Sequence, residues 1–232
     1  MLVVSYDDIS SVIKDISCLL NVLQKRGKMK GINLNPVLET QTIAWGKLLS
    51  LEEIRSEMEN CVRCKLHAGR THLVFGEGNP DARLLFFGEG PGRDEDEQGR
   101  PFVGRAGQLL DKIIESMGFS RSDVYICNVV KCRPPNNRNP EEDEIRICKQ
   151  FALAQIDSVD PEAIVTLGKI ASQALLETST PISKLRGQLQ EYNSIPVMPT
   201  YHPAYLLRNP SQKREVWEDM KKVMALLGKV PK

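Results

Sequence analysis

Four of the six cysteines in the chain have the surroundings of metal ligands. Cys61 and Cys64 form a CxxC pair, while Cys132 and Cys148 lie beside basic loops farther along the chain. A zinc ribbon or finger needs a second close pair, and the spacing between residues 132 and 148 is too open for one. Four thiolates from separate segments suit an iron–sulfur cluster at least as well as zinc. The spacing therefore leaves both metals open, with a redox dithiol at the CxxC as a third alternative.

Polar residues that follow apolar runs are candidates for binding a ligand. Asn128 ends one such run, and because a buried amide without partners costs about 1–3 kcal/mol, it needs either a ligand or nearby backbone groups. His202 ends another run and precedes a proline, which restricts its backbone to extended or turn conformations. The glycines of "GEGPG" (88–92) would let backbone N–H groups approach a ligand, although a tight turn explains them equally well. The dinucleotide fingerprint and the P-loop both fail to match.

Charged residues surround these positions. The run "RDEDEQGR" (93–100) is most simply a solvated loop. Cations flank the segments that leave the strands. Scattered surface charge explains them most simply, and their clustering near the strand ends is also compatible with a face that follows phosphates. These cations are Lys131, Arg133, Arg138, Lys184, Arg186, Arg208, Lys213 and Arg214.

Apolar runs alternate with amphipathic segments from residue 83 onward, as in parallel strands joined by helices. The predicted strands are 83–88, 123–130, 163–168 and 196–201. The predicted helices are 107–118, one from Pro140 capped by Asn139, 169–177 and 214–228. In such sheets ligands bind beyond the carboxyl ends of the strands. We therefore expect the glycine loop, Asn128 and His202 to meet at one edge of a parallel sheet.

Two further helices precede this alternation. Residues 7–25 have an amphipathic period and contain Cys18 as a packed thiol, and Ser50 with Glu53 forms a capping box for a short second helix. A basic, glycine-containing segment lies between them. We predict a helical extension and linker over 1–45 and a domain over 46–232.

Composition sets the class of protein. A net charge of +1 means that any contact with nucleic acid must come from a local basic face. The chain has no apolar stretch of about 18 residues and no signal peptide, so we expect a cytoplasmic protein with reduced thiols. Cys127 lies in an apolar strand and is predicted to be core.

Residues 50–228 resemble the family 4, or iron–sulfur, uracil-DNA glycosylases. The resemblance rests on "GEGPGRDEDEQGRPFVGRAG", "CNVVKCRPP", "HPAYLLRNP" and the four-cysteine set. It implies a three-layer α/β/α sandwich around a four-stranded, mostly parallel sheet. It also implies that Cys61, Cys64, Cys132 and Cys148 hold a structural [4Fe–4S] cluster, with no nucleotide cofactor.

The resemblance implies a function in base excision repair. The enzyme would flip uracil out of single- or double-stranded DNA and hydrolyse its glycosidic bond, leaving an abasic site without lyase activity. Phe102 would stack on the base, Asn128 would read its edge, and Gly90 would let the main chain line the pocket. His202 would donate a hydrogen bond to the departing uracil.

Other roles follow less directly from the motifs. Related glycosylases place an aspartate where this chain has Gly90, so Glu89 is the nearest candidate to orient water, and Glu95 is a candidate to exclude the thymine methyl group. No histidine lies between "GEGPG" and His202, so we expect turnover without a covalent adduct. His67 and His72 are predicted to be structural.

The remaining predictions concern partners. Lys131, Arg133, Leu206, Leu207 and Arg208 are the predicted DNA-binding residues, the leucines as a wedge that replaces the flipped base. We expect a nucleoid-associated monomer that acts on uracil-containing DNA and not on membranes, and residues 1–45 are a candidate site for a replication or repair protein. Two alternatives are a non-catalytic, polymerase-associated binding domain and a redox protein.

Overall fold

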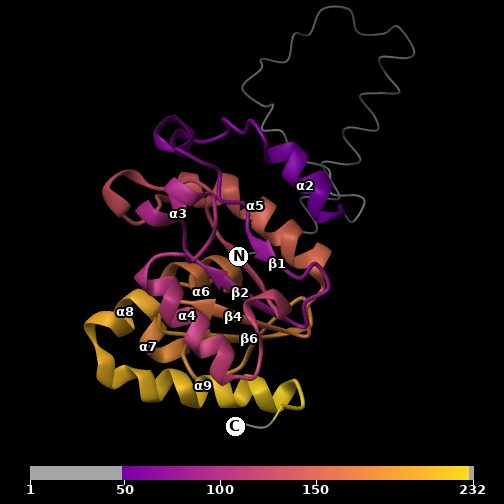
Figure 1. Cartoon of the computed structure of the whole chain (residues 1–232), viewed down its shortest axis with the longest axis vertical. Helices are drawn as coiled ribbons and strands as arrows, with labels where there is room; N and C mark the ends of the chain where they lie inside the picture. The colour runs from indigo at the N-terminus through magenta and orange to yellow at the C-terminus, as the bar shows by residue number, and fades with distance from the viewer. Residues whose placement is uncertain (1–48, 230–232) are drawn as a thin grey trace, which may run out of the picture. The chain divides into compact units, whose positions relative to one another are not determined.

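The computed structural model describes residues 49–229 (Figure 1). The predicted helix 7–25, its packed cysteine and the predicted boundary near residue 45 lie outside these residues, so they stay predictions. Among residues 49–229 no helix has the length and apolar character that a bilayer span requires.

A six-stranded sheet forms the centre of the described domain, in the order β1-β3-β2-β4-β6-β5. The four inner strands are parallel to one another, and the two short edge strands pair antiparallel with their neighbours. The α/β class is confirmed, but the prediction of four strands omitted both edges. The strands are β1 Glu77–Gly78, β2 Leu84–Gly88, β3 Tyr125–Asn128, β4 Ala163–Leu167, β5 Gln190–Tyr192 and β6 Ile195–Thr200.

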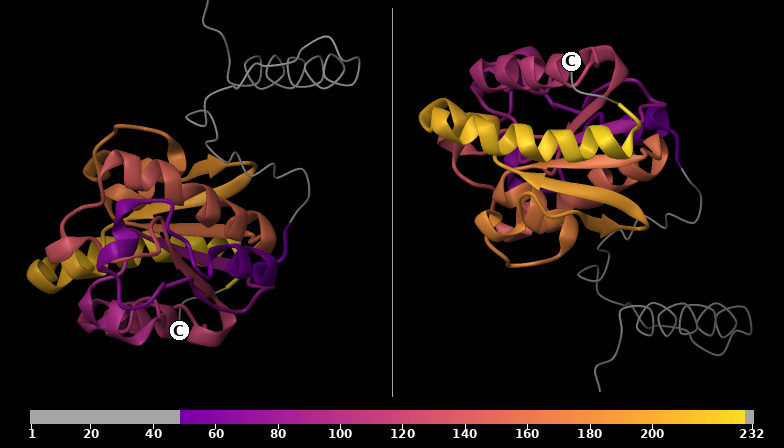
Figure 2. Two further views of the ribbon diagram at one scale, coloured as in Figure 1. Left: turned by 90° about the horizontal axis from the view of Figure 1, so that it is seen from above. Right: turned by 90° about the horizontal axis from the view of Figure 1, so that it is seen from below.

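Helices cover both faces of the sheet, which gives the predicted three layers. The α-helices are α2 Leu51–Met58, α3 Arg93–Gln98, α4 Arg105–Ser116, α5 Glu142–Val159, α6 Lys169–Leu176, α7 Ile182–Leu185, α8 Pro203–Arg208 and α9 Lys213–Leu226. Short 3-10 helices are Lys65–Gly69, Arg121–Asp123, Pro135–Asn137 and Pro210–Gln212. In Figure 1, α2 and α5 lie toward the top of the view and α9 lies at the bottom, with α4 and α8 at the level of the strands, and Figure 2 shows the long α9 across one face.

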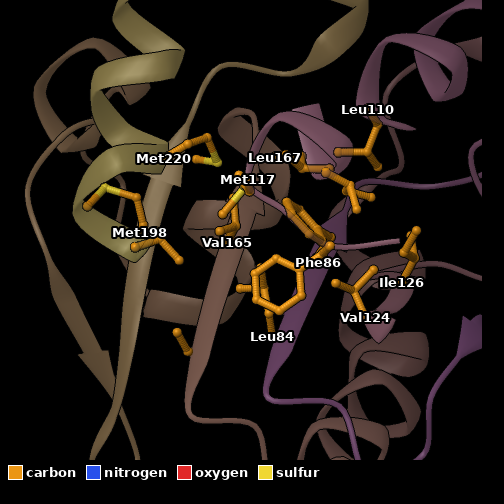
Figure 3. Packing of buried hydrophobic residues seen from close by; sticks show 14 of the residues in the cluster. Leu84, Phe86, Leu110, Met117, Val124, Ile126, Val165, Leu167, Met198 and Met220 are labelled. Atoms are coloured by element: carbon orange, nitrogen blue, oxygen red, sulfur yellow. The ribbon is translucent and has the colours of Figure 1, made fainter. Parts of the chain in front are cut away.

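The main core lies between the sheet and the layer of α4, α8 and α9. Alternate residues of the strands point into it, so Phe86 of β2 and Val165 of β4 meet Met117, which follows α4, and Met220 of α9 (Figure 3). Burying apolar surface on this scale supplies the main stabilisation of a domain of this size. The core holds the sheet rigid, and the loops at its carboxyl edge are therefore placed by a fixed frame.

Two helix starts show what local sequence does and does not decide. Ser50 and Glu53 form the predicted capping box of α2. The predicted start of α5 at Asn139 and Pro140 is wrong, because Glu141 is the cap and the helix begins at Glu142. The N–H of Glu141 donates to the buried carboxylate of Glu144 at 2.7 Å, which closes the first turn two residues later than predicted.

The charge run at 93–100 is also different from the prediction. Residues 93–98 form the helix α3 and not a solvated loop. Its Asp96 is buried, and one carboxylate oxygen accepts the N–H of Thr71 at 2.8 Å. The charge run therefore contains a helix in which Glu95 and Asp96 accept backbone N–H groups, while Glu97 faces water.

Candidate functional site

A cleft of about 450 Å³ opens at the carboxyl edge of the sheet. The chain order places β3 and β4 on opposite sides of β2, and such a switch point is where open α/β sheets bind ligands. The cleft is lined by residues that follow β2, β3 and β6: Glu89, Gly90, Pro91, Gly92, Glu95, Phe102, Ala106, Asn128, Pro134, Asn137, Arg138, Asn139, His202, Ala204, Tyr205 and Arg208. All the residues predicted to bind uracil are among them.

Asn128 brings an unsatisfied oxygen into the cleft. The residue is 1% exposed, and its Oδ1 accepts no hydrogen bond from any residue that the structure describes. Gly88 lies against it: a Cβ at position 88 would overlap Asn128 Oδ1 and come within 2.6 Å of the Phe102 ring. The buried carbonyl oxygen therefore needs a donor, which a ligand in the cleft would supply, since an unmet acceptor costs about 1–3 kcal/mol.

The Phe102 ring forms a second wall of the cleft. It stacks with the His202 ring, with centroids 5.6 Å apart and planes 29° apart. Its backbone has a φ of 51°, a conformation that is costly for a bulky residue and that neighbouring contacts must maintain. The ring is 5% exposed, so a flat ligand in the cleft would meet a rigid aromatic face.

The Glu95 carboxylate maintains this conformation. One oxygen accepts the N–H groups of Val103 and Gly104, each at 2.9 Å, and the other accepts the N–H of Gly92 at 3.1 Å. Glu95 does line the cleft, but both of its oxygens are engaged by backbone. The carboxylate thus fastens the loop after Phe102 to the glycine loop after β2.

His202 is held as a neutral hydrogen-bond donor. Its Nδ1 accepts the N–H of Ala204 at 3.1 Å, which assigns the proton to Nε2. Burial, together with the positive charge of Arg208, lowers the pKa of His202 to about 4. At neutral pH the imidazole can therefore donate a hydrogen bond without carrying a charge.

Glu89 provides the carboxyl group that sequence alone singled out beside the glycine loop. It is half-buried at the cleft, and burial raises the pKa of its side chain. A Cβ at the neighbouring Gly90 would lie 2.6 Å from Val130 Cγ2, so a side chain there would require Val130 to move. Glu89 is the acid next to this glycine.

Two of the residues predicted to contact DNA are buried, which contradicts that prediction. Lys131 is fully buried, and its Nζ donates to Asn128 O at 2.7 Å and to Gln155 Oε1. Leu206 is 1% exposed in the main core, so it is not available as a wedge. Leu207 is 37% exposed, so its role as a wedge stays a prediction.

The other two basic residues predicted to contact DNA are not buried. Arg208 lines the cleft, and Arg133 is half-buried with its Nε donating to Asn137 Oδ1 at 2.7 Å. Arg138, one of the cations predicted to flank the strand ends, lines the cleft and binds the Glu144 carboxylate with both terminal nitrogens. The sequence feature that could have indicated a turn here is the pair of asparagines, because Asn136 and Asn137 both adopt positive φ.

The four predicted metal ligands line one small cavity. Cys61 and Cys64 follow α2, Cys132 follows β3, and Cys148 lies on α5. None of them is in a disulfide. Cys127 lies within β3 and is core, as predicted.

Four thiols from three separate segments are a donor set that a [4Fe–4S] cluster takes. Within residues 49–229 no three His, Cys, Asp or Glu side chains converge as ligands of one metal ion. In a [4Fe–4S] cluster each thiolate binds a different iron, so the sulfurs surround the group instead of meeting at a point. Burial raises the pKa of Cys148 to about 12, so a thiolate there requires a metal or another strong positive charge.

Two arginines make this cavity suitable for an anionic group. Arg70 donates from Nη1 to Cys132 Sγ at 3.3 Å and to Cys61 O at 2.8 Å. Arg63 also lines the cavity, and its buried Nε has no acceptor among the described residues. An iron–sulfur cluster with four thiolates is negatively charged, so it would provide hydrogen-bond acceptors and a counter-charge for both guanidinium groups.

Comparisons with known proteins identify the family. Residues 75–221 match the sequence profile of the Uracil DNA glycosylase superfamily. A Type-4 uracil-DNA glycosylase of Thermotoga maritima is 47% identical over 183 residues, which cover 77% of this chain and 95% of the relative. One of Saccharolobus solfataricus is 45% identical over 191 residues, 78% of this chain and 88% of the relative. A DNA polymerase of Bacillus phage SP01 is 33% identical over 159 residues, 68% of this chain and 17% of the relative.

Proposed function

Since the chain belongs to the uracil DNA glycosylase superfamily, within its type-4 group, we propose that it removes uracil from DNA by hydrolysing the bond between the base and deoxyribose. The target bond is buried in a duplex, so the nucleotide must leave the stack and enter the cleft, at a cost of a few kcal/mol. The observation that carries the proposal is the unpartnered Oδ1 of Asn128, buried beside the stacked rings of Phe102 and His202.

Asn128 would select uracil by its hydrogen-bonding edge. Its Oδ1 accepts from N3–H of the base, and its amide nitrogen donates to O4. Cytosine presents an acceptor and a donor in the reverse positions, so it would leave buried polar groups unpaired on both partners. Sites that depend on such pairing can discriminate by about 10⁴ or more. Phe102 would stack on the face of the base.

His202 and Glu89 would carry the chemical step. The bond from the sugar carbon to N1 breaks, its electron pair leaves with uracil, and positive charge develops on the sugar. Nε2–H of His202 donates to O2 of the uracil anion and stabilises the leaving group without transferring its proton. Water then attacks the sugar carbon, and the Glu89 carboxylate, when ionised, accepts its proton.

Cys61, Cys64, Cys132 and Cys148 would hold the [4Fe–4S] cluster. When bound, the cluster supplies a crosslink between α2, the segment after β3 and α5. Arg133, Leu207 and Arg208 would contact DNA from the surface beside the cleft. We propose that the protein acts as a monomer on single- and double-stranded DNA.

A release assay tests the function. The expected result is an abasic site in single- and double-stranded oligonucleotides that contain one uracil, without added cofactor and without a protein–DNA adduct on a denaturing gel. A second candidate, a non-catalytic DNA-binding domain, is favoured only by the similarity to part of a phage DNA polymerase. Equal binding of DNA with and without uracil, with no base released, would support that candidate instead.

A further inference from the structure

Lys131 occupies an unusual position for a lysine. It is fully buried between the cleft and the cysteine cavity, three residues after Asn128 and directly before Cys132. Its ammonium group donates to the backbone oxygen of Asn128 at 2.7 Å and to Gln155 Oε1. Burying an ammonium group costs several kcal/mol unless it is well paired, so its retention in the interior calls for a specific role.

Gln155 connects this lysine to the helix that bears a cysteine. Its Nε2 donates to Phe75 O at 3.0 Å and to Tyr125 Oη at 3.1 Å, which fixes the orientation of its amide. Gln155 and Cys148 are both on α5, seven residues apart, so they share one face of the helix. Lys131 itself lines the cysteine cavity. One chain of contacts therefore runs from the cavity through α5 and Lys131 to the backbone of Asn128.

We propose that Lys131 is a positioning residue that fixes the Asn128 peptide, and with it the base-reading amide, to the helix that bears Cys148. The inference rests on the proposed function, since it concerns the placement of the amide that would read uracil. Lys131 then acts on the rate of uracil release and not on the affinity for DNA. A displacement of about 1 Å in a reacting group can reduce a rate by about 100-fold, so a backbone restraint of this kind has measurable value.

Lys131→Met tests the proposal, because methionine fills similar volume without a donor. The expected result is a single-turnover rate of uracil release about 10- to 100-fold lower. Affinity for uracil-free DNA of the same length, its dependence on salt, and the visible absorbance of the cluster should all stay as in the natural protein. Arg133→Met is the matched control, since it removes a surface cation on the other side of Cys132. It should weaken DNA binding and reduce the salt dependence by about one unit of slope.

A second pair of variants tests the same link with Lys131 intact. Gln155→Glu and Gln155→Met both lose the donors to Phe75 and Tyr125, but only the glutamate keeps an acceptor for Lys131. We expect Gln155→Glu to release uracil at least about fivefold faster than Gln155→Met. Equal rates in the two variants would overturn the proposal, whether or not Lys131→Met folds.

Other outcomes are equally decisive. A Lys131→Met protein with weaker DNA binding and a lower salt slope would make Lys131 a phosphate contact and overturn the proposal. Loss of the cluster absorbance together with the rate would assign Lys131 to cluster retention and would also overturn it. If the natural protein releases no uracil, the proposed function fails; if it does so and Lys131→Met matches it, only this inference fails.

Discussion

The cleft and the cysteine cavity are assembled in different ways. The cleft draws its residues from segments that directly follow β2, β3 and β6, so the parallel sheet brings them to one edge. The cavity joins two cysteines after α2 to one after β3 and one on α5, and apolar side chains such as Met58 and Phe151 close it. The cleft holds an unmet acceptor for a ligand, whereas the cavity holds thiols that need positive charge to ionise.

Because of this difference, we expect substitutions in the cleft to reduce mainly activity and substitutions in the cavity to reduce mainly stability. The core and the sheet place the cleft, so its polar groups can be removed with little effect on folding. The cavity connects three distant segments, so removal of its ligands should affect folding first and catalysis second. The following experiments would contradict or refine that separation.

Asn128→Ala should have the largest effect on activity. The rate of uracil release is expected to fall about 1,000-fold or more, because the variant can neither read the base nor meet its polar edge. The free energy of unfolding should stay within about 1 kcal/mol of the natural value, because the lost oxygen has no partner in the described residues. Single-turnover kinetics and urea unfolding measure the two quantities. Asn79→Ala is the control, because Asn79 lies in a turn and is not among the residues that line the cleft.

Gly88→Ala should lower the rate about 100-fold. The new methyl group would overlap Asn128 Oδ1 and crowd the Phe102 ring, so both base-binding side chains must move. Overpacking of this kind also costs about 1–3 kcal/mol of stability. Gly69→Ala is a matched control, since a Cβ at that position meets no atom within 4 Å. Equal activity of the two variants would show that Gly88 does not set the position of Asn128.

Cys132→Ser should reduce stability more than activity, which is the reverse of the effect expected for Asn128→Ala. We expect loss of the visible iron–sulfur absorbance and a lower midpoint of thermal unfolding, with a rate at low temperature reduced only about tenfold, because the sheet still places the cleft residues. Absorbance, calorimetry and release at 15 °C would be measured on one preparation. Cys127→Ser, which alters a thiol in the core instead of the cavity, should keep the absorbance. A loss of rate as large as that of Asn128→Ala would mean that the two sites are not separable.

The pH dependence should show the smallest effect on activity. Because the pKa of His202 is lowered to about 4, its imidazole stays neutral above pH 5, and its protonation should change the rate less than twofold between pH 5.5 and pH 8. Stability should follow a different course. The unfolded chain takes up this proton near pH 6.5 and the folded chain only near pH 4, so stability falls as pH is lowered through that window, by up to about 3 kcal/mol.

His202→Gln is the control for both measurements. It should remove this part of the pH dependence of stability, as urea titrations at pH 7 and pH 4.5 would show. A rate that falls with an apparent pKa near 6.5 in the natural protein but not in His202→Gln would mean that the imidazole is charged in the free enzyme, because an inflection caused by Glu89 would persist in both proteins.

The sequence by itself determined the frame of this protein. Alternating apolar and amphipathic segments predicted the four parallel strands and their helices, since buried strands and half-buried helices have different periods. The motifs that follow three of those strands identified the residues of the cleft, because the carboxyl ends of parallel strands share an edge.

Only the tertiary structure decided which way individual side chains point. Lys131 and Arg133 are both basic and flank one cysteine, yet α5 buries the first and leaves the second at the surface. Leu206 and Leu207 are adjacent leucines, and packing of α8 on the core separates them in the same way. Local sequence cannot distinguish such neighbours, because the choice depends on residues that are distant along the chain and adjacent only after folding.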